Sequence, residues 1–295
     1  MRRAVSILAL VLLCLVYFAA RPRAASDQAK VMNGIAMLDY SKTPRWKVGT
    51  WVQYKMEGES EMGHRDDYLV TIVIAGEEVF WGDTCFWLET WTQHAGRQRR
   101  AVASLISYSV FDDSLAWARP QLYVRKVING LDDEGLPRQE VYLRGADTFK
   151  IRNAIGADRT RNLDTLGWEQ TTVPAGTFKS LKVHRKYWAG GSVVKGDSTL
   201  YDESHENTDS FYSADVPITR LVKQQFESVG YKKSWLIGQS QDAPLRVVDK
   251  GEGTASLVGF GRDTTAALIP ENVRKAVART TPKRTQTTTA AKKRG

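Results

Sequence analysis

Residues 167–183 read GWEQTTVPAGTFKSLKV, and this stretch predicts two β-strands joined by a tight turn. Pro174 fixes its own φ and lacks an N–H donor, and Gly176 allows backbone conformations that other residues avoid. Beyond the turn, Leu181 and Val183 alternate with polar residues, which is the period of two expected of a half-buried strand. The core of the fold is therefore expected to be antiparallel β-sheet.

Segments of the same character lie on both sides of this stretch. Residues 46–56 alternate, with Val52 and Tyr54 on one face, and residues 68–75 are apolar on both faces, which is typical of a central strand. The polar residues 202–209 predict a solvated loop. Residues 102–111 predict a strand or a short helix, and residues 144–166 a connection with some helical content. Further strands are expected at residues 79–92, 122–128, 140–143, 199–201, 211–217, 218–226 and 234–238.

The short strands and the frequent turn residues favour a mainly β fold with few short helices. Its sheet is expected to be either a curled antiparallel half-barrel or a closed barrel. Residues 26–269 are expected to form this single domain, between an N-terminal segment, 1–25, and a C-terminal tail, 270–295.

The net charge of +9 is concentrated at the two ends of the chain. Residues 1–25 carry +4 and residues 270–295 carry +7, which leaves −2 for the expected domain. A nearly neutral domain argues against a nucleic-acid partner. The positive start followed by the apolar run from Ala4 to Ala20 predicts an export signal, either cleaved or kept as an anchor. The tail is basic and has no aromatic residues, so we expect it to be disordered.

Once residues 1–25 are removed, Cys85 is the only cysteine. A single cysteine cannot form an intramolecular disulfide, so burial alone must hold the fold together. The apolar neighbours Phe86 and Trp87 predict that Cys85 is a small buried side chain rather than a reactive thiol.

No motif in the sequence predicts an enzyme, a metal site or a cofactor. Ser198 lies in a Gly-Asp-Ser block like that of one class of esterases, and His205 follows closely, but both fall within one expected connection between strands. The acidic residues around His205 fit neither a calcium loop nor a zinc motif, and a solvated loop is the simpler interpretation.

Four pieces of the sequence carry a resemblance to a known family: KVGTWVQY at 47–54, GDTCFWL at 82–88, TVPAGTF at 172–178, and SADVP at 213–217 followed by LVK at 221–223. In these pieces the chain resembles a family of exported bacterial proteins of unknown function. The resemblance implies a fold like the curled half-barrel of the periplasmic lipoprotein carriers LolA and LolB, which hold acyl chains under a lid of helices. It implies no catalytic residues.

The first functional hypothesis is a non-enzymatic protein of the bacterial periplasm or envelope that binds a lipid or a lipoprotein acyl chain on a concave β face. The alternative is an envelope scaffold with a filled core, whose basic tail contacts an anionic membrane surface. Strand alternation gives the residues expected to line the ligand site: Val52, Tyr54, Val70, Ile72, Phe86, Leu88, Leu181 and Val183.

Overall fold

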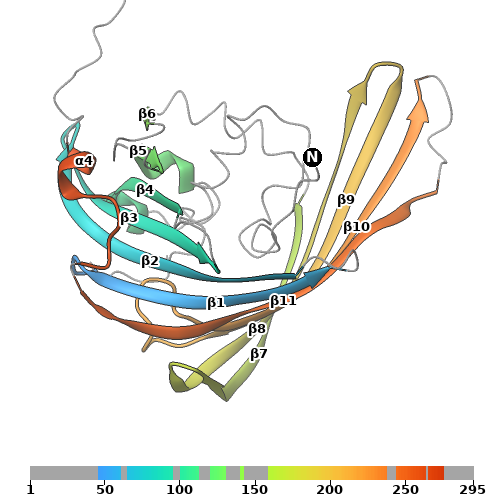
Figure 1. The fold of residues 1–295 in the computed structure, drawn as a ribbon. Helices are drawn as coiled ribbons and strands as arrows, with labels where there is room; N and C mark the ends of the chain where they lie inside the picture. Colours follow the sequence, from blue (N-terminus) through green and yellow to red (C-terminus); the bar gives the residue numbers. More distant parts are fainter. Residues whose placement is uncertain are drawn as a thin grey trace, which may run out of the picture.

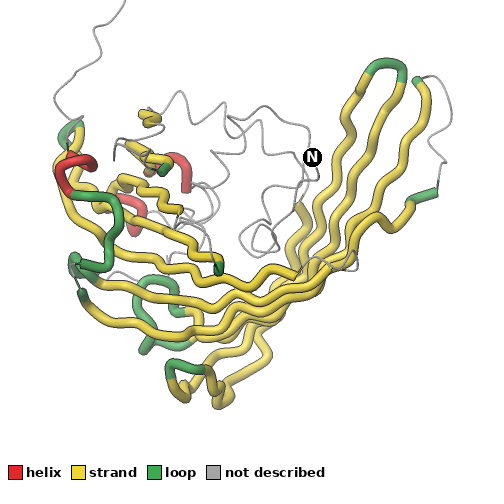
Figure 2. Tube along the Cα trace, viewed as in Figure 1, coloured by secondary structure: helices red, strands yellow, loops and turns green. Residues whose placement is uncertain are grey.

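The computed structural model describes residues 46–60, 65–95, 100–112, 120–130, 140–142, 159–237, 244–263 and 265–275. Its strands form one curled antiparallel sheet of eleven strands (Figures 1 and 2). The order across the sheet is β6-β5-β4-β3-β2-β1-β11-β10-β9-β8-β7. Because β6 and β7 are edges, the described strands form an open sheet. This confirms the expected half-barrel and rules out the closed-barrel alternative for these strands.

The strands are β1 (Thr50–Ser60), β2 (Arg65–Phe80), β3 (Asp83–His94), β4 (Arg100–Ser107), β5 (Val124–Asn129), β6 (Glu140–Tyr142), β7 (Arg159–Val173), β8 (Gly176–Lys195), β9 (Ser198–Tyr212), β10 (Leu221–Leu236) and β11 (Arg246–Arg262). The helical segments are the 3-10 turns η1 (Tyr108–Phe111) and η3 (Pro120–Tyr123) and the helix α4 (Glu271–Lys275). The hairpin expected at Pro174 is confirmed, since β7 and β8 pair from Val173 and Gly176 onward. Residues 102–111 were predicted to form a strand or a short helix, and they contain one of each: β4 ends at Ser107 and the 3-10 turn η1 begins at Tyr108.

The first and last described strands pair with each other at the centre of the sheet. β1 lies between β2 on one side and β11 on the other, and the β1–β11 register runs from Thr50 opposite Arg262 to Ser60 opposite Gly251. β11 in turn pairs with β10. The pairing of β1 with β11 therefore joins the two halves of the sheet, and it does so through the first and the last described strands in the sequence.

The sheet has two faces, which we call inner and outer. The inner face carries Val52, Tyr54 and Ile72, and it packs into a large apolar cluster with the β9–β10 connection and the β7–β8 turn. The outer face carries Trp51 and Trp87 and packs into a second cluster. Residues 265–275, which we call the strap, cover this second cluster through Ala266, Ile269, Val273 and their neighbours.

Cys85 lies in the outer cluster and is fully buried, as expected. Burial is the first cause that raises the pKa of its thiol to about 12. A thiol with that pKa stays protonated at neutral pH, so it is unsuited to nucleophilic chemistry.

Two expectations about secondary structure are wrong, and one strand was not predicted. The expected loop at 202–209 is part of the continuous strand β9, and residues 159–166 belong to β7 rather than to a partly helical connection. The strand that was not predicted is β11. β9 continues through polar residues because its inward side chains find partners: Gln224 donates to Ser210, and Thr208 donates to Glu206.

β11 is a strand in spite of its glycines because side chains from neighbouring strands cover them. A Cβ on Gly253 would lie 2.6 Å from the ring of Phe226, and one on Gly259 would lie 3.2 Å from the ring of Trp51. Glycine normally weakens a strand because it has no side chain to pack. In β11 the rings from β10 and β1 supply that packing.

The strap includes the first residues of the expected tail. Residues 270–275 are ordered against the sheet, and Arg274 is only 6% exposed, which differs from the expectation of a disordered tail from residue 270 onward. Residues 276–295 and the expected export segment, 1–25, lie outside the described residues.

Candidate functional site

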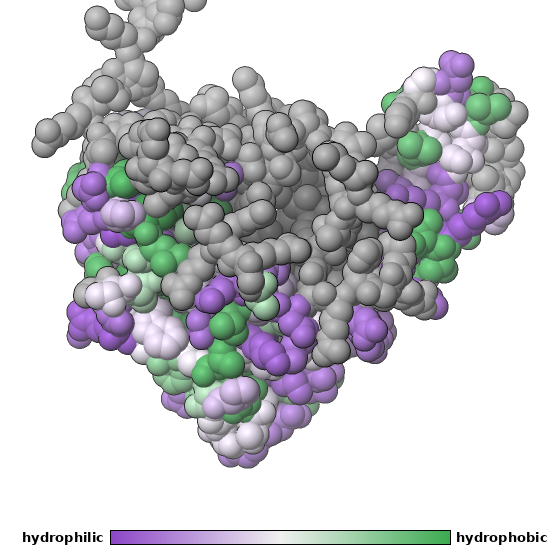
Figure 3. All heavy atoms as spheres, viewed as in Figure 1, coloured by the Kyte–Doolittle hydropathy of each residue, from purple (hydrophilic) through white to green (hydrophobic). Residues whose placement is uncertain are grey.

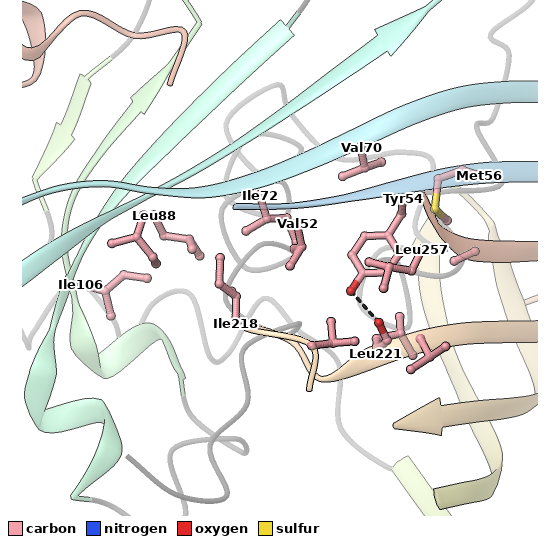
Figure 4. Packing of buried hydrophobic residues seen from close by; sticks show 14 of the residues in the cluster. Val52, Tyr54, Met56, Val70, Ile72, Leu88, Ile106, Ile218, Leu221 and Leu257 are labelled. Carbon is pink, nitrogen blue, oxygen red and sulfur yellow. Dashed lines mark hydrogen bonds between the residues drawn. The ribbon is translucent and has the colours of Figure 1, made fainter. Parts of the chain in front are cut away.

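The eight residues expected to line a ligand site lie on the inner face, but in two different settings. Leu181 and Val183 are half-buried on β8 and lie outside the large cluster. The other six are 0–1% exposed and pack together in that cluster: Val52, Tyr54, Val70, Ile72, Phe86 and Leu88. Figure 4 labels five of these, all except Phe86.

Tyr54 shows how this interior is closed. Its hydroxyl contacts Thr219 Oγ1 at 2.5 Å and donates to the carbonyl oxygen of Leu221 at 2.8 Å (Figure 4). Desolvation is the main cause that raises the pKa of this hydroxyl far above its ordinary value. Ile218, in the same connection, is 1% exposed within the cluster. Side chains of the protein therefore occupy the space between the sheet and the β9–β10 connection.

The outer face carries a groove of about 800 Å³ across the middle of the sheet. It spans strands from β2 to β8, all of which are paired on both sides. Gly58, Phe226 and Gly253 contribute to its lining. The other lining residues are polar: Glu57, Glu59, Asp67, His184, Lys186, Asn207, Asp209, Gln225, Glu227, Glu252 and Thr254.

The strand register arranges these polar residues in two rows across the sheet. Paired residues of neighbouring strands project from the same face, so each row is a line of adjacent side chains. The first row is Glu59, Glu252, Glu227, Asn207 and Lys186. The second row is Asp67, Glu57, Thr254, Gln225, Asp209 and His184.

The groove is strongly acidic. Three glutamates follow one another directly in the first row, on β1, β11 and β10. Six carboxylates line the groove, and the basic residues in the lining are Lys186 and His184. Two of the six form ion pairs with lysines beside the groove, Glu57 with Lys55 at 2.5 Å and Asp209 with Lys182 at 2.9 Å. The lining as a whole still carries an excess of negative charge.

One groove carboxylate, Asp209, is held by two neighbouring side chains. Lys182 Nζ lies 2.9 Å from one of its oxygens, and His184 Nδ1 lies 2.6 Å from the other. Partial burial acts to raise the pKa of Asp209, but the contacts with Lys182 and His184 outweigh it and hold the pKa below its ordinary value. Asp209 therefore stays ionised at a lower pH than an aspartate at its ordinary pKa does.

Beyond the groove, β8, β9 and β10 continue as an arm (Figure 1). Its outer face carries Trp188, His205 and Tyr231, which we call the aromatic shelf. Trp188 lies opposite His205 in the register, and the rings of His205 and Tyr231 meet edge to face with centroids 5.2 Å apart. Polar and apolar residues are interspersed over the described surface seen in Figure 3, including this arm.

A single carboxylate, Glu203, is hydrogen-bonded to two of the three shelf residues. Glu203 accepts a hydrogen bond from the Tyr201 hydroxyl at 2.8 Å, is hydrogen-bonded to His205 Nε2, and receives a third hydrogen bond from Trp188. Partial burial acts to raise the pKa of Glu203, but these hydrogen bonds outweigh it and hold the pKa below its ordinary value. Glu203 therefore holds the Trp188 and His205 side chains in place.

A separate polar network lies under the strap on the outer face. Glu89 is fully buried and accepts hydrogen bonds from the backbone N–H groups of Leu268 and Ile269. Arg274 donates to the carbonyl oxygens of Ala75 and Ile269, at 2.7 and 2.6 Å. Its guanidinium lies 3.7 Å from Glu89. These contacts fasten the strap to the sheet, and we assign them to stability.

The residues considered for catalysis are not brought together. Ser198 and His205 lie seven positions apart in the same strand, with no bulge between them, so their side chains project from opposite faces. The acidic residues near His205 alternate between the faces in the same way. Within the described ranges, no group of three or more His, Cys, Asp or Glu side chains could hold a metal ion.

The groove was not among the sites predicted from the sequence. The signal was present as alternation in the assumed loop, where Glu203, His205, Asn207 and Asp209 occupy every second position. Such a period of two indicates a strand even when both faces are polar.

Comparison with known proteins leaves the family open. A scan of protein-family models gives no match, and neither does a search of curated proteins. One similar solved structure is a candidate exported protein with a YmcC-like fold from Bacteroides fragilis, at 9% identity and a TM-score of 0.27 over 73% of this chain and 97% of that one. Another is a candidate lipoprotein from Parabacteroides distasonis, at 12% identity and a TM-score of 0.29 over 76% and 99%.

Neither similarity is strong enough to support an argument about this chain, and the resemblance to LolA and LolB remains a prediction. Within the described residues, no helix combines the length and the apolar character needed to cross a membrane.

Proposed function

We propose that this chain is a non-enzymatic, exported interaction protein with a filled core, and that it binds its ligand on the outer face of the sheet. The observation that carries the proposal is the contrast between the two faces. On the inner face, six of the eight expected lining residues are buried against one another. On the outer face, the groove of about 800 Å³ is lined by polar side chains. Export rests on the N-terminal segment of the sequence.

The deciding experiment is native mass spectrometry, with lipid extraction, on the protein purified without detergent. A protein with a filled core is expected to show the mass of the polypeptide alone and to release no stoichiometric lipid. A stoichiometric acyl-bearing adduct would contradict the filled core and support a lipid carrier instead.

Lipid carriage is the second candidate, and Leu181 and Val183 favour it. Both lie on the inner face of β8, outside the packed cluster, and both are half-buried. If an acyl chain lies along this part of the sheet, Leu181→Asp should abolish its retention while the core remains folded. Leu166→Asp, at a residue that is 58% exposed on β7, is the matched control and should retain the lipid.

The basic tail remains part of the proposal as a contact for anionic membrane surfaces. Arg274 is buried and hydrogen-bonded within the strap, so the basic residues beyond residue 275 would have to make the contact with the membrane. Deleting residues 276–295 is expected to weaken binding to phosphatidylglycerol vesicles at low salt, where the attraction is least screened. Unchanged binding would remove the tail from the proposal.

A further inference from the structure

We propose that the groove and the aromatic shelf together bind an oligosaccharide that carries cationic amino sugars. This inference rests on the proposed function, because it names the ligand class of the same outer surface. It joins three observations: a row of like charges, a neighbouring set of aromatic rings, and amide side chains within the two rows of the groove.

The like charges indicate a cationic ligand. Glu59, Glu252 and Glu227 lie directly opposite one another on three adjacent strands. Like charges in directly opposite positions destabilise a sheet. Glu59 also has a basic residue opposite it, Arg65 on β2, but Glu252 lies between two glutamates and Glu227 lies between a glutamate and Asn207. A ligand with several positive charges would be attracted by these carboxylates and would offset their mutual repulsion. An anionic ligand would be repelled by them.

The spacing of the carboxylates favours a chain of charges over a single ion. The three glutamates occupy three strands, and neighbouring strands are roughly 4.8 Å apart. Among the described residues, no group of acidic, histidine or cysteine side chains is arranged to hold a metal ion. The positive charge that matches this row is therefore distributed along an extended molecule.

The aromatic shelf continues the groove on the same face. The row of Lys186, Asn207 and Glu227 lies two residues, or roughly 7 Å, from Trp188 and His205. Aromatic faces attract both apolar C–H surfaces and cations. The arm already shows such a contact, because Lys233 Nζ lies 5.4 Å from the ring centroids of both Tyr201 and Trp235. A sugar ring with an ammonium group presents both kinds of surface.

The remaining polar groups suit sugar hydroxyls. Asn207 and Gln225 lie in the two rows of the groove, and each amide can donate and accept hydrogen bonds. A peptide that binds by adding a strand needs a free sheet edge. The groove crosses strands that are paired on both sides, so its ligand is recognised by side chains rather than by backbone pairing.

The test is isothermal titration of the full-length protein, in mildly acidic buffer, with four probes of similar charge or size. These are a β-1,4-linked glucosamine hexasaccharide, its N-acetylated counterpart, spermine and a galacturonic acid hexasaccharide. The glucosamine probe is expected to bind most tightly and the galacturonic acid probe not at all. N-acetylation removes the positive charges and should weaken binding by about tenfold or more.

Variants of the shelf separate sugar recognition from simple charge attraction. Trp188→Ala should weaken binding of the glucosamine hexasaccharide by about tenfold, and Trp188→Phe should restore most of the affinity because it keeps an aromatic face. Trp168→Ala is the matched control, since Trp168 is 62% exposed on β7, away from the groove, and binding should not change.

The outcomes distinguish this inference from the proposed function. Spermine binding as tight as the hexasaccharide, with no effect of Trp188→Ala, would overturn the sugar ligand and leave the groove as a site for other polycations, basic peptides included. Binding of none of the four probes would count against both the sugar ligand and the assignment of function to the groove. Tight binding of the galacturonic acid probe would overturn the charge argument.

Discussion

Glu227 lies directly opposite Glu252 where β10 pairs with β11. Glu252 also lies opposite Glu59 on its other side, where β11 pairs with β1. β11 thus places one carboxylate between two others on the outer face. Opposite like charges lower the stability of a sheet by about 0.2–1 kcal/mol per pair.

Replacing the middle charge should stabilise the fold. Glu252→Lys turns two repulsive cross-strand pairs into two attractive ones, and we expect the free energy of unfolding to rise by about 1 kcal/mol at low salt. Chemical denaturation measures this change, and high salt should reduce it. Glu169→Lys, at an exposed residue of β7 opposite Ser180, is the control and should have no measurable effect. A destabilised Glu252→Lys protein would show that the row is not repulsive.

Gly253 should not tolerate a side chain. A Cβ at this position would lie 2.6 Å from the Phe226 ring and 2.8 Å from the carbonyl oxygen of Glu57. Gly253→Ala should therefore destabilise the protein by about 2 kcal/mol, because the ring must leave its place over β11. Gly230→Ala on β10 is the control, since its Cβ would meet its nearest neighbours at an ordinary 3.7 Å. Equal midpoints of thermal unfolding for the two variants would contradict this packing.

Ile72 distinguishes a filled core from a ligand-lined one. It is fully buried in the inner cluster, so Ile72→Ala should leave a cavity and lower the free energy of unfolding by about 3 kcal/mol. Leu166→Ala, at a side chain that is 58% exposed, should change it little. If Ile72→Ala cost no more than this control, the residue would not be part of a packed interior.

The strap should make stability depend on pH through Glu89. Burial is the main cause that raises the pKa of this carboxyl above its ordinary value of 4.5, while the two backbone N–H groups and Arg274 act against it. The folded state therefore binds this proton more tightly than the unfolded state does. The resulting stabilisation is complete below pH 4.5 and is lost as the pH rises through the pKa of the folded protein.

Glu89→Gln isolates this effect. The variant should be less stable throughout, because one of the backbone N–H groups of Leu268 and Ile269 loses its acceptor. The difference in the free energy of unfolding between the parent protein and Glu89→Gln should be largest at acidic pH and should shrink toward neutral pH. Denaturant unfolding across that range measures it. Glu169→Gln, on the exposed face of β7, should show no such trend. A deficit that grows with pH would contradict the raised pKa.

The sequence predicted the parts of the fold in which apolar residues alternate. The Pro174 turn, the inner-face residues of β1 and the burial of Cys85 follow from local patterns of hydrophobicity and turn chemistry, and the structure confirms them. The pattern in β1 cannot tell a packed interior from a ligand cavity, because both need apolar side chains on the same face. What fills the space depends on the β9–β10 connection, which is distant in the sequence.

The parts that were missed depend on contacts between distant segments. β11 is glycine-rich, and its strand character comes from the rings of Phe226 and Trp51 on neighbouring strands. The acidic segment of β9 has the composition of a loop, but it gains partners from β8 and β10. The groove is therefore a property of the register among strands, which no single segment encodes.

The pairing of β1 with β11 also sets an order of events during synthesis. β1 is among the first described strands to be made, yet the strand that covers its second edge ends only at Arg262. While the intervening chain is being made, β1 exposes an unpaired edge, which is prone to aggregation. The hairpins β1–β2 and β7–β8 can form locally, but the two halves of the sheet can join only when the last strand arrives. A chain that stops before β11 would leave two separate half-sheets, each with an exposed edge.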